Sequence, residues 1–120
     1  MITRIGRKSA RSVHGNPPGI MWEVPVLIEF GGTQALILSL VDRRGGRIAC
    51  SVRYWLGRIG DQGWSRNADF PEMGLPLDYG PDFYAAMINL EKGWPLEERV
   101  LVAWASNWEV GPSQPIGCEG

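Results

Sequence analysis

The sequence has 120 residues, of which 44% are hydrophobic, and its formal net charge is −1. This length predicts a single domain with a real hydrophobic core, and the near-neutral charge excludes a polycation over the whole chain. The sixteen glycines and nine prolines favour short elements joined by turns over a bundle of long helices.

Residues 1–19 are predicted to form a flexible basic arm. The segment ends in Gly15-Asn16-Pro17-Pro18-Gly19, a sequence that breaks any helix or strand. Charge is divided unevenly, because residues 1–66 hold ten basic and four acidic side chains and residues 67–120 hold two basic and nine acidic ones. Two interpretations of the arm stay open, a disordered terminus or a segment that contacts phosphates. Its basic residues are Arg4, Arg7, Lys8 and Arg11.

Two strands and the turn between them are predicted from Trp22 onward. Residues 22–30 are rich in β-forming side chains, and Pro25 lacks a backbone donor, so this segment is expected to be an edge strand or to begin after the proline. Gly31-Gly32 is predicted to be a turn. Residues 33–41 form a nearly all-apolar second strand, and both of its faces are expected to be covered.

The clearest hairpin signal is Asp42-Arg43-Arg44-Gly45-Gly46, because paired glycines supply the positive φ angles of tight turns. Residues 47–56 are the returning strand, and its side chains alternate between two faces. The face expected to belong to a core consists of Ile48, Cys50, Val52, Tyr54 and Leu56. The opposite face, cationic at two positions and aromatic at one, consists of Arg47, Ala49, Ser51, Arg53 and Trp55.

One helix is predicted, at Pro81–Lys92. Pro81 and Asp82 suit the first turn of a helix, and Gly93 ends it. An apolar stripe at helical spacing is expected to face the core. The stripe consists of Phe83, Ala86, Met87 and Leu90.

The remaining segments complete an α+β prediction. Residues 57–71 are expected to be a loop, residues 74–77 a short strand, and residues 99–108 a final strand. The predicted fold is an antiparallel, strongly twisted sheet of four to five strands packed against the single helix. This domain spans residues 20–110, between the basic arm and a loose tail over residues 111–120.

No catalytic or metal-binding constellation is predicted, so the chain is interpreted as a non-enzyme without a cofactor. The one histidine, His14, lies in the arm, where nothing fixes its position. Cys50 is expected to be buried, and zinc requires more Cys and His ligands than the chain contains. The acidic pairs Asp78/Asp82 and Glu97-Glu98 are interpreted as capping and solvating residues.

A cationic and aromatic set of side chains is the pattern that points to a function. Guanidinium groups neutralise phosphates, and aromatic planes stack on bases at about 1–3 kcal/mol each. The opposing interpretation is that Trp55 packs under the helix and the arginines form an ordinary solvated face. The predicted nucleic-acid site consists of Arg43, Arg44, Arg47, Arg53, Trp55, Arg58, Trp64 and Arg66.

The segment from Gln34 to Leu56, which ends in Ser-Val-Arg-Tyr-Trp, resembles the hairpin of the PC4-like family of transcriptional coactivators. Residues 73–78 and the predicted helix resemble that family's short Gly-x-x-Leu strand and single helix, so the resemblance covers about residues 24–92. It implies a curved four-stranded sheet backed by one helix, a homodimer, and non-specific binding of single-stranded DNA. It also implies that Arg53 and Trp55 are the family's strand-end pair and that Arg47 is its basic residue after the turn.

Other functions are weighed beside this one. The main alternative is a phage- or mobile-element-type inhibitor or immunity protein that binds another protein through a Trp-rich, acidic surface. That surface would include Trp94, Trp104 and Trp108. An enzyme is the least favoured class. The expected partners are single-stranded nucleic acid and a second copy of the chain, or alternatively a host or cognate protein, with no membrane.

A cytoplasmic location is expected. The longest apolar run, Ala35–Leu38, is far too short to cross a bilayer, and no apolar segment of a signal peptide follows the basic N-terminus. The two cysteines, Cys50 and Cys118, do not make a disulfide framework, which fits a reducing compartment.

Overall fold

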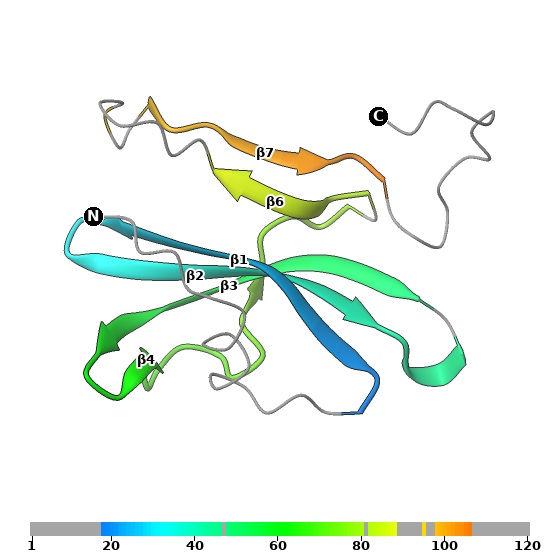
Figure 1. Cartoon of the computed structure of the whole chain (residues 1–120), viewed down its shortest axis with the longest axis horizontal. Helices are drawn as coiled ribbons and strands as arrows, with labels where there is room; N and C mark the ends of the chain where they lie inside the picture. The colour runs from blue at the N-terminus through cyan, green and yellow to red at the C-terminus, as the bar shows by residue number, and fades with distance from the viewer. Residues whose placement is uncertain (1–17, 47, 81, 89–94, 96–97, 107–120) are drawn as a thin grey trace.

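A computed structural model describes residues 18–46, 48–80, 82–88, 95 and 98–106. In these ranges the chain forms strands and short 3-10 turns, with no α-helix (Figure 1). The described domain is therefore all-β, and the α+β prediction is wrong. The elements are β1 (Ile20–Phe30), β2 (Thr33–Asp42), η1 (Arg44–Gly46), β3 (Ala49–Gly60), β4 (Gly63–Arg66), β5 (Leu75–Pro76), β6 (Tyr84–Ile88) and β7 (Leu101–Trp104).

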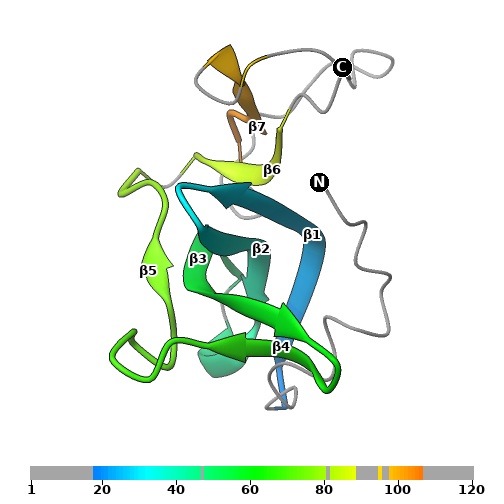
Figure 2. The same ribbon diagram turned by 90° about the vertical axis from the view of Figure 1, so that its left-hand side faces the viewer.

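The main sheet is antiparallel and follows the chain in the order β1-β2-β3-β4, with β5 paired to β3 (Figure 2). Both predicted hairpins are confirmed, because Phe30 pairs with Thr33 and Asp42 pairs with Ala49. Gly45 and Gly46 have φ angles of 75° and 78°, which glycine adopts without steric cost. β1 pairs with β2 alone among the described strands, as expected for a strand that contains proline.

The segment predicted as a loop over residues 57–71 begins with a third hairpin instead. β3 continues to Gly60, which pairs with Gly63 of β4. At Gly57 a Cβ atom would lie 2.2 Å from the backbone oxygen of Ser65, so the close approach of these strands requires glycine. The repeated glycines therefore permit strand pairing here, and the prediction of a flexible loop is wrong for this part.

The predicted helix at Pro81–Lys92 is also wrong, because Tyr84–Ile88 form β6, which pairs antiparallel with β7. Burial alternates between neighbouring residues at the end of this strand, since Ala86 is buried whereas Met87 is 60% exposed. A short apolar run satisfies helical and strand periods alike, and here the pairing with β7 decides. The last part of the predicted helix, Leu90 included, lies outside the described residues. The predicted strands over residues 74–77 and 99–108 are confirmed by β5 and β7.

The main sheet has two covered faces. On one, called the hairpin face, Ile37 and Val52 pack against Ala86 of β6, and β6 contacts β1, β2 and β3 (Figure 1). On the other, called the loop face, a cluster that includes Leu36 and Trp55 packs against side chains of β4 and the segment that follows it. β2 is therefore covered on both faces, as predicted.

Three smaller observations complete the description. Within the described ranges, no helix has the length and apolar character needed to cross a membrane. Cys50 is half-buried and free. Cys118, the tail over residues 111–120 and residues 1–17 of the predicted arm lie outside the described residues.

Candidate active site

Glu23 lies on β1 immediately before a β-bulge. It pairs with Ser39, and the register resumes at the pair Val26–Ile37, so β1 contains one extra residue between these pairs. Because side chains alternate with a period of two, one extra residue reverses the faces of all that follow. The bulge therefore puts Glu23 on the hairpin face together with Val26, instead of on the loop face.

Tyr84 begins β6 and is followed by a second bulge. It pairs with Trp104, and the register resumes at Met87–Val102, so the extra residue is again on the strand that carries the polar side chain. Tyr84 is 3% exposed, and its ring makes an edge contact with that of Trp104 at 6.3 Å between centroids. The phenol is thus fixed by packing at the edge of the paired strands β6 and β7, which cover the main sheet.

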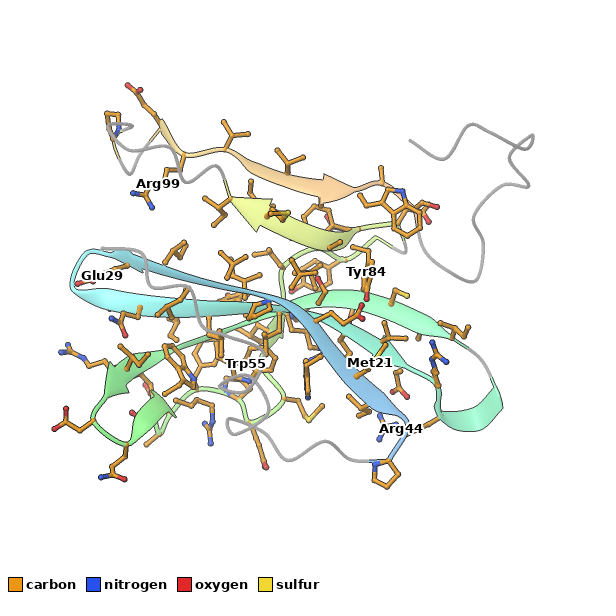
Figure 3. All side chains as sticks on the ribbon, in the orientation of Figure 1. Met21, Glu29, Arg44, Trp55, Tyr84 and Arg99 are labelled. Atoms are coloured by element: carbon orange, nitrogen blue, oxygen red, sulfur yellow. The ribbon has the colours of Figure 1, made fainter. Side chains whose placement is uncertain are left out.

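These two residues form a direct contact across 61 positions of sequence. The Tyr84 hydroxyl donates a hydrogen bond of 2.5 Å to Oε2 of Glu23. The bond ties the hairpin to the sheet and orients the half-buried carboxylate of Glu23. Figure 3 shows Tyr84 on the side of the sheet that carries β6 and β7, and Trp55 on the other side.

Backbone strain is concentrated next to this contact. Among the described residues, the non-glycine residues with positive φ are Val24 at 48° and Ala85 at 51°. Each directly follows one member of the Glu23–Tyr84 pair. Left-handed backbone is unfavourable for residues with a Cβ, above all for a β-branched one, and such conformations cluster at active sites and ligand clamps. Both the strain and the bulges therefore mark this contact as the candidate site.

Other described carboxylates differ from Glu23 in their surroundings. Apart from Glu23, Asp42 alone among them is partly buried, and the rest are exposed. Arg44 binds Asp42 through its side chain, at 2.6 Å between Nη2 and Oδ2, and through its backbone N–H. These bonds from Arg44 lower the pKa of Asp42 to about 2. Asp42 pairs with Ile20 on the loop face, so its carboxylate lies on the opposite face of the sheet from Glu23.

Trp55 is not the exposed stacking platform that the nucleic-acid hypothesis required. Its side chain is 0% exposed, its Nε1 donates to the backbone oxygen of Glu72 at 2.9 Å, and its ring contacts that of Trp22 edge-on. Arg53 shares the loop face, as the alternation predicted, and its Nη1 donates to the backbone oxygens of Met73 and Gly74. That face is therefore covered, and the expectation that it is open is wrong.

The other predicted site residues are spread over several turns. Arg58 donates to the backbone oxygen of Gly32, and Arg66 donates to the backbone oxygens of Asn67 and Phe70. Trp64 is half-buried and packs against the loop-face cluster. Arg43 is exposed beside the ion-paired Arg44, and Arg47 lies outside the described residues.

Sequence reasoning missed Glu23 and Tyr84. Their contact depends on two bulges and on a hairpin that was predicted to be a helix. Pro25 gave a usable signal, because proline inside a strand is confined to edges and bulges. It indicated an edge strand, but it could not tell which face the preceding carboxylate occupies.

Comparison with known proteins gives a family. Residues 6–117 match the model of the glycosyl hydrolases family 32 N-terminal domain. A stretch of 39 residues is 44% identical to the protein named "Putative glycosyl hydrolase ecdE" from Aspergillus rugulosus, and it covers 32% of this chain and 5% of that protein. The chain thus spans a small part of the length of this curated relative. No solved structure matches the chain.

The family match corrects the functional predictions made from the sequence. It contradicts the resemblance to the PC4-like family, the binding of single-stranded DNA with its inhibitor alternative, and the interpretation as a non-enzyme. The resemblance rested on a glycine-turn hairpin, which many β proteins share, and on a helix that is strand β6. The homodimer, the expected partners and the cytoplasmic location are not tested and stay predictions. With 6–117 of its 120 residues matched, the chain belongs to the glycosyl hydrolases family 32, in its N-terminal domain.

Proposed function

We propose that this chain is a glycoside hydrolase domain in which Glu23 is one of two catalytic carboxylates. Glycoside hydrolysis is generally carried out by a pair of Asp or Glu residues that flank the scissile bond. The observation that carries the proposal is the hydrogen bond from Tyr84 to Glu23, made between two bulged strands in a chain of this family.

The geometry of Glu23 suits this role. Its Oε2 is held by the Tyr84 hydroxyl, and no described residue hydrogen-bonds its Oε1. One oxygen is therefore fixed, and the other can serve the glycosidic oxygen, a water molecule or the anomeric carbon. An orienting bond of this kind reduces the entropic cost of reaching a reactive geometry.

The architecture supports the proposal as well. The strands β1 to β4 form an antiparallel sheet in chain order, and a second antiparallel sheet packs on its face. Four-stranded antiparallel sheets are the repeating blades of β-propellers. The Glu23–Tyr84 contact joins two successive sheets, so it lies where neighbouring blades would meet.

The test is hydrolysis of a panel of chromogenic aryl glycosides by the purified chain. Glu23→Gln keeps the size of the side chain and removes the carboxylate, so kcat should fall about 10²- to 10⁴-fold. Glu29→Gln is the matched control, because Glu29 lies on the same strand and is exposed. It should retain the wild-type rate.

The leaving group identifies the role of the carboxylate. If Glu23 donates the proton, an activated dinitrophenyl leaving group should restore much of the rate of Glu23→Gln. If Glu23 is the nucleophile, that rate should stay low with every leaving group. Full activity of Glu23→Gln would contradict the proposal.

A further inference from the structure

Ser39 is a buried polar residue without a partner. Its side chain is 1% exposed, and its Oγ makes no hydrogen bond within the described structure. Burial of a hydroxyl without a partner is unfavourable, and such groups are rare in folded proteins. An unpaired hydroxyl at this position therefore requires an explanation.

The register places this hydroxyl beside Glu23. Ser39 pairs directly with Glu23 on β1 and with Val52 on β3, so the three side chains form one row across the hairpin face. Its neighbours on the same face of β2 are Ile37 and Val41, which are buried and apolar. Among these four flanking residues Glu23 alone has a polar side chain. Directly paired residues have Cβ atoms about 4.5–5.5 Å apart, so the two side chains are within reach.

We infer that Ser39 is a positioning residue for the Glu23 carboxylate, an inference that rests on the function proposed above. Rotation about χ1 moves Oγ between staggered positions, and in one of them the hydroxyl donates to Oε1, the oxygen not held by Tyr84. The two donors then fix both carboxylate oxygens and so the plane of the group.

A hydroxyl suits a carboxylate whose charge changes during the reaction. In glycoside hydrolysis each catalytic carboxylate changes charge, either by losing and regaining a proton or by forming and losing an ester. Oε1 can accept a hydrogen bond from the serine hydroxyl through one lone pair in both the ionised and the protonated form, and its other position stays available to the substrate. Ser39 therefore holds Glu23 in both states. No proton leaves the serine in this process.

The experiment uses the 120-residue chain labelled with ¹³C at its glutamate side-chain carboxyls. The resonance of Glu23 is identified by its loss in Glu23→Gln. Ser39→Ala should shift this resonance and lower kcat about tenfold, with KM unchanged, because it removes a hydrogen bond to a charged group. Ser51→Ala is the matched control, since Ser51 lies on β3, pairs with Leu40 and faces the other way. Ser51→Ala should change neither quantity.

The outcomes distinguish the positioning role of Ser39 from the proposed catalytic role of Glu23. Ser39→Thr keeps the hydroxyl and should restore the wild-type resonance, which a purely steric role of Ser39 would not produce. If Tyr84→Phe shifts the Glu23 resonance and Ser39→Ala does not, Ser39 does not position Glu23, whereas the proposed function stands. If both variants shift it but Glu23→Gln hydrolyses glycosides at the wild-type rate, the contact is real and the proposed function fails.

Discussion

The two faces of the main sheet use buried polar groups in different ways. On the loop face, Trp55 and Arg53 donate to backbone carbonyls of residues 72–74, which are fixed parts of the fold. On the hairpin face, Glu23 is held by a side chain, Tyr84, and keeps one oxygen without a described donor. Donation to the backbone ties segments together, whereas a carboxylate that is oriented but not saturated is able to react. The loop face therefore stabilises the fold, and the hairpin face carries the carboxylate that we propose to be catalytic.

The backbone also differs between the two faces, because one face is closely packed and the other contains strained φ angles. The loop face depends on close packing, because a Cβ atom on Gly74 would lie 2.5 Å from the Trp55 ring. The hairpin face depends on bulges at Val24 and Ala85, where two non-glycine residues adopt positive φ. Tight packing lowers the energy of a fold, and local strain raises it. Such strain clusters at active sites and ligand clamps, so it supports the proposed role of Glu23.

The largest predicted effect concerns the loop face. Trp55→Ala should lower the free energy of unfolding by about 3–5 kcal/mol, because it leaves a large cavity under the segment that follows β4. Chemical denaturation measures this loss. Met87→Ala is the control, since Met87 is 60% exposed on the outer side of β6, and it should change stability by less than about 0.5 kcal/mol. A loss of stability below about 1 kcal/mol for Trp55→Ala would show that the loop face is not part of the hydrophobic core.

Much of the main sheet could be predicted from its turns. Gly31-Gly32 and Gly45-Gly46 fix the hairpins that join β1, β2 and β3, and the alternation over residues 47–56 correctly separated Val52 from Trp55. Whether each face is covered could not be predicted in the same way. The cover of Trp55 comes from a segment that sequence patterns described as a loop, so exposure depended on tertiary packing that no local pattern contains.

Prediction of the candidate site failed for a physical reason. A face assignment by alternation holds only while the register is constant, and one extra residue after Glu23 reverses it. The partner, Tyr84, lies in a run of apolar residues that fits both a helix and a strand, and pairing with β7 selects the strand. Neither the bulge nor the pairing is encoded in a single short window of sequence.

A second prediction tests the strain on the hairpin face. A valine in left-handed backbone costs about 1–2 kcal/mol, and Val24→Gly removes this cost. The gain is offset by the loss of a half-buried side chain and by the flexibility of glycine, so the net change in stability should be within about 1 kcal/mol. Val26→Gly is the control on the same strand, where no strain is relieved, and it should cost about 2–3 kcal/mol. Equal losses for the two variants would show that Val24 is not strained.

The smallest predicted effect concerns Asp42, the partly buried carboxylate on the loop face. The bonds from Arg44 lower its pKa from 3.8 to about 2, so the pair stabilises the folded chain above pH 4 and this contribution is lost as the pH falls from about 4 to about 2. The effect should be slight, because the Arg44 side chain is 57% exposed and water and salt screen the pair. Asp42→Asn should lower the denaturation midpoint at pH 6 and leave it unchanged near pH 2, whereas Asp61→Asn, at the exposed turn between β3 and β4, should show no such dependence.

Asp42 is ion-paired and faces away from Glu23, so Asp42→Asn should also leave glycoside hydrolysis intact. A loss of hydrolysis in Asp42→Asn without a loss of stability would place chemistry on the loop face and break the division between the two faces.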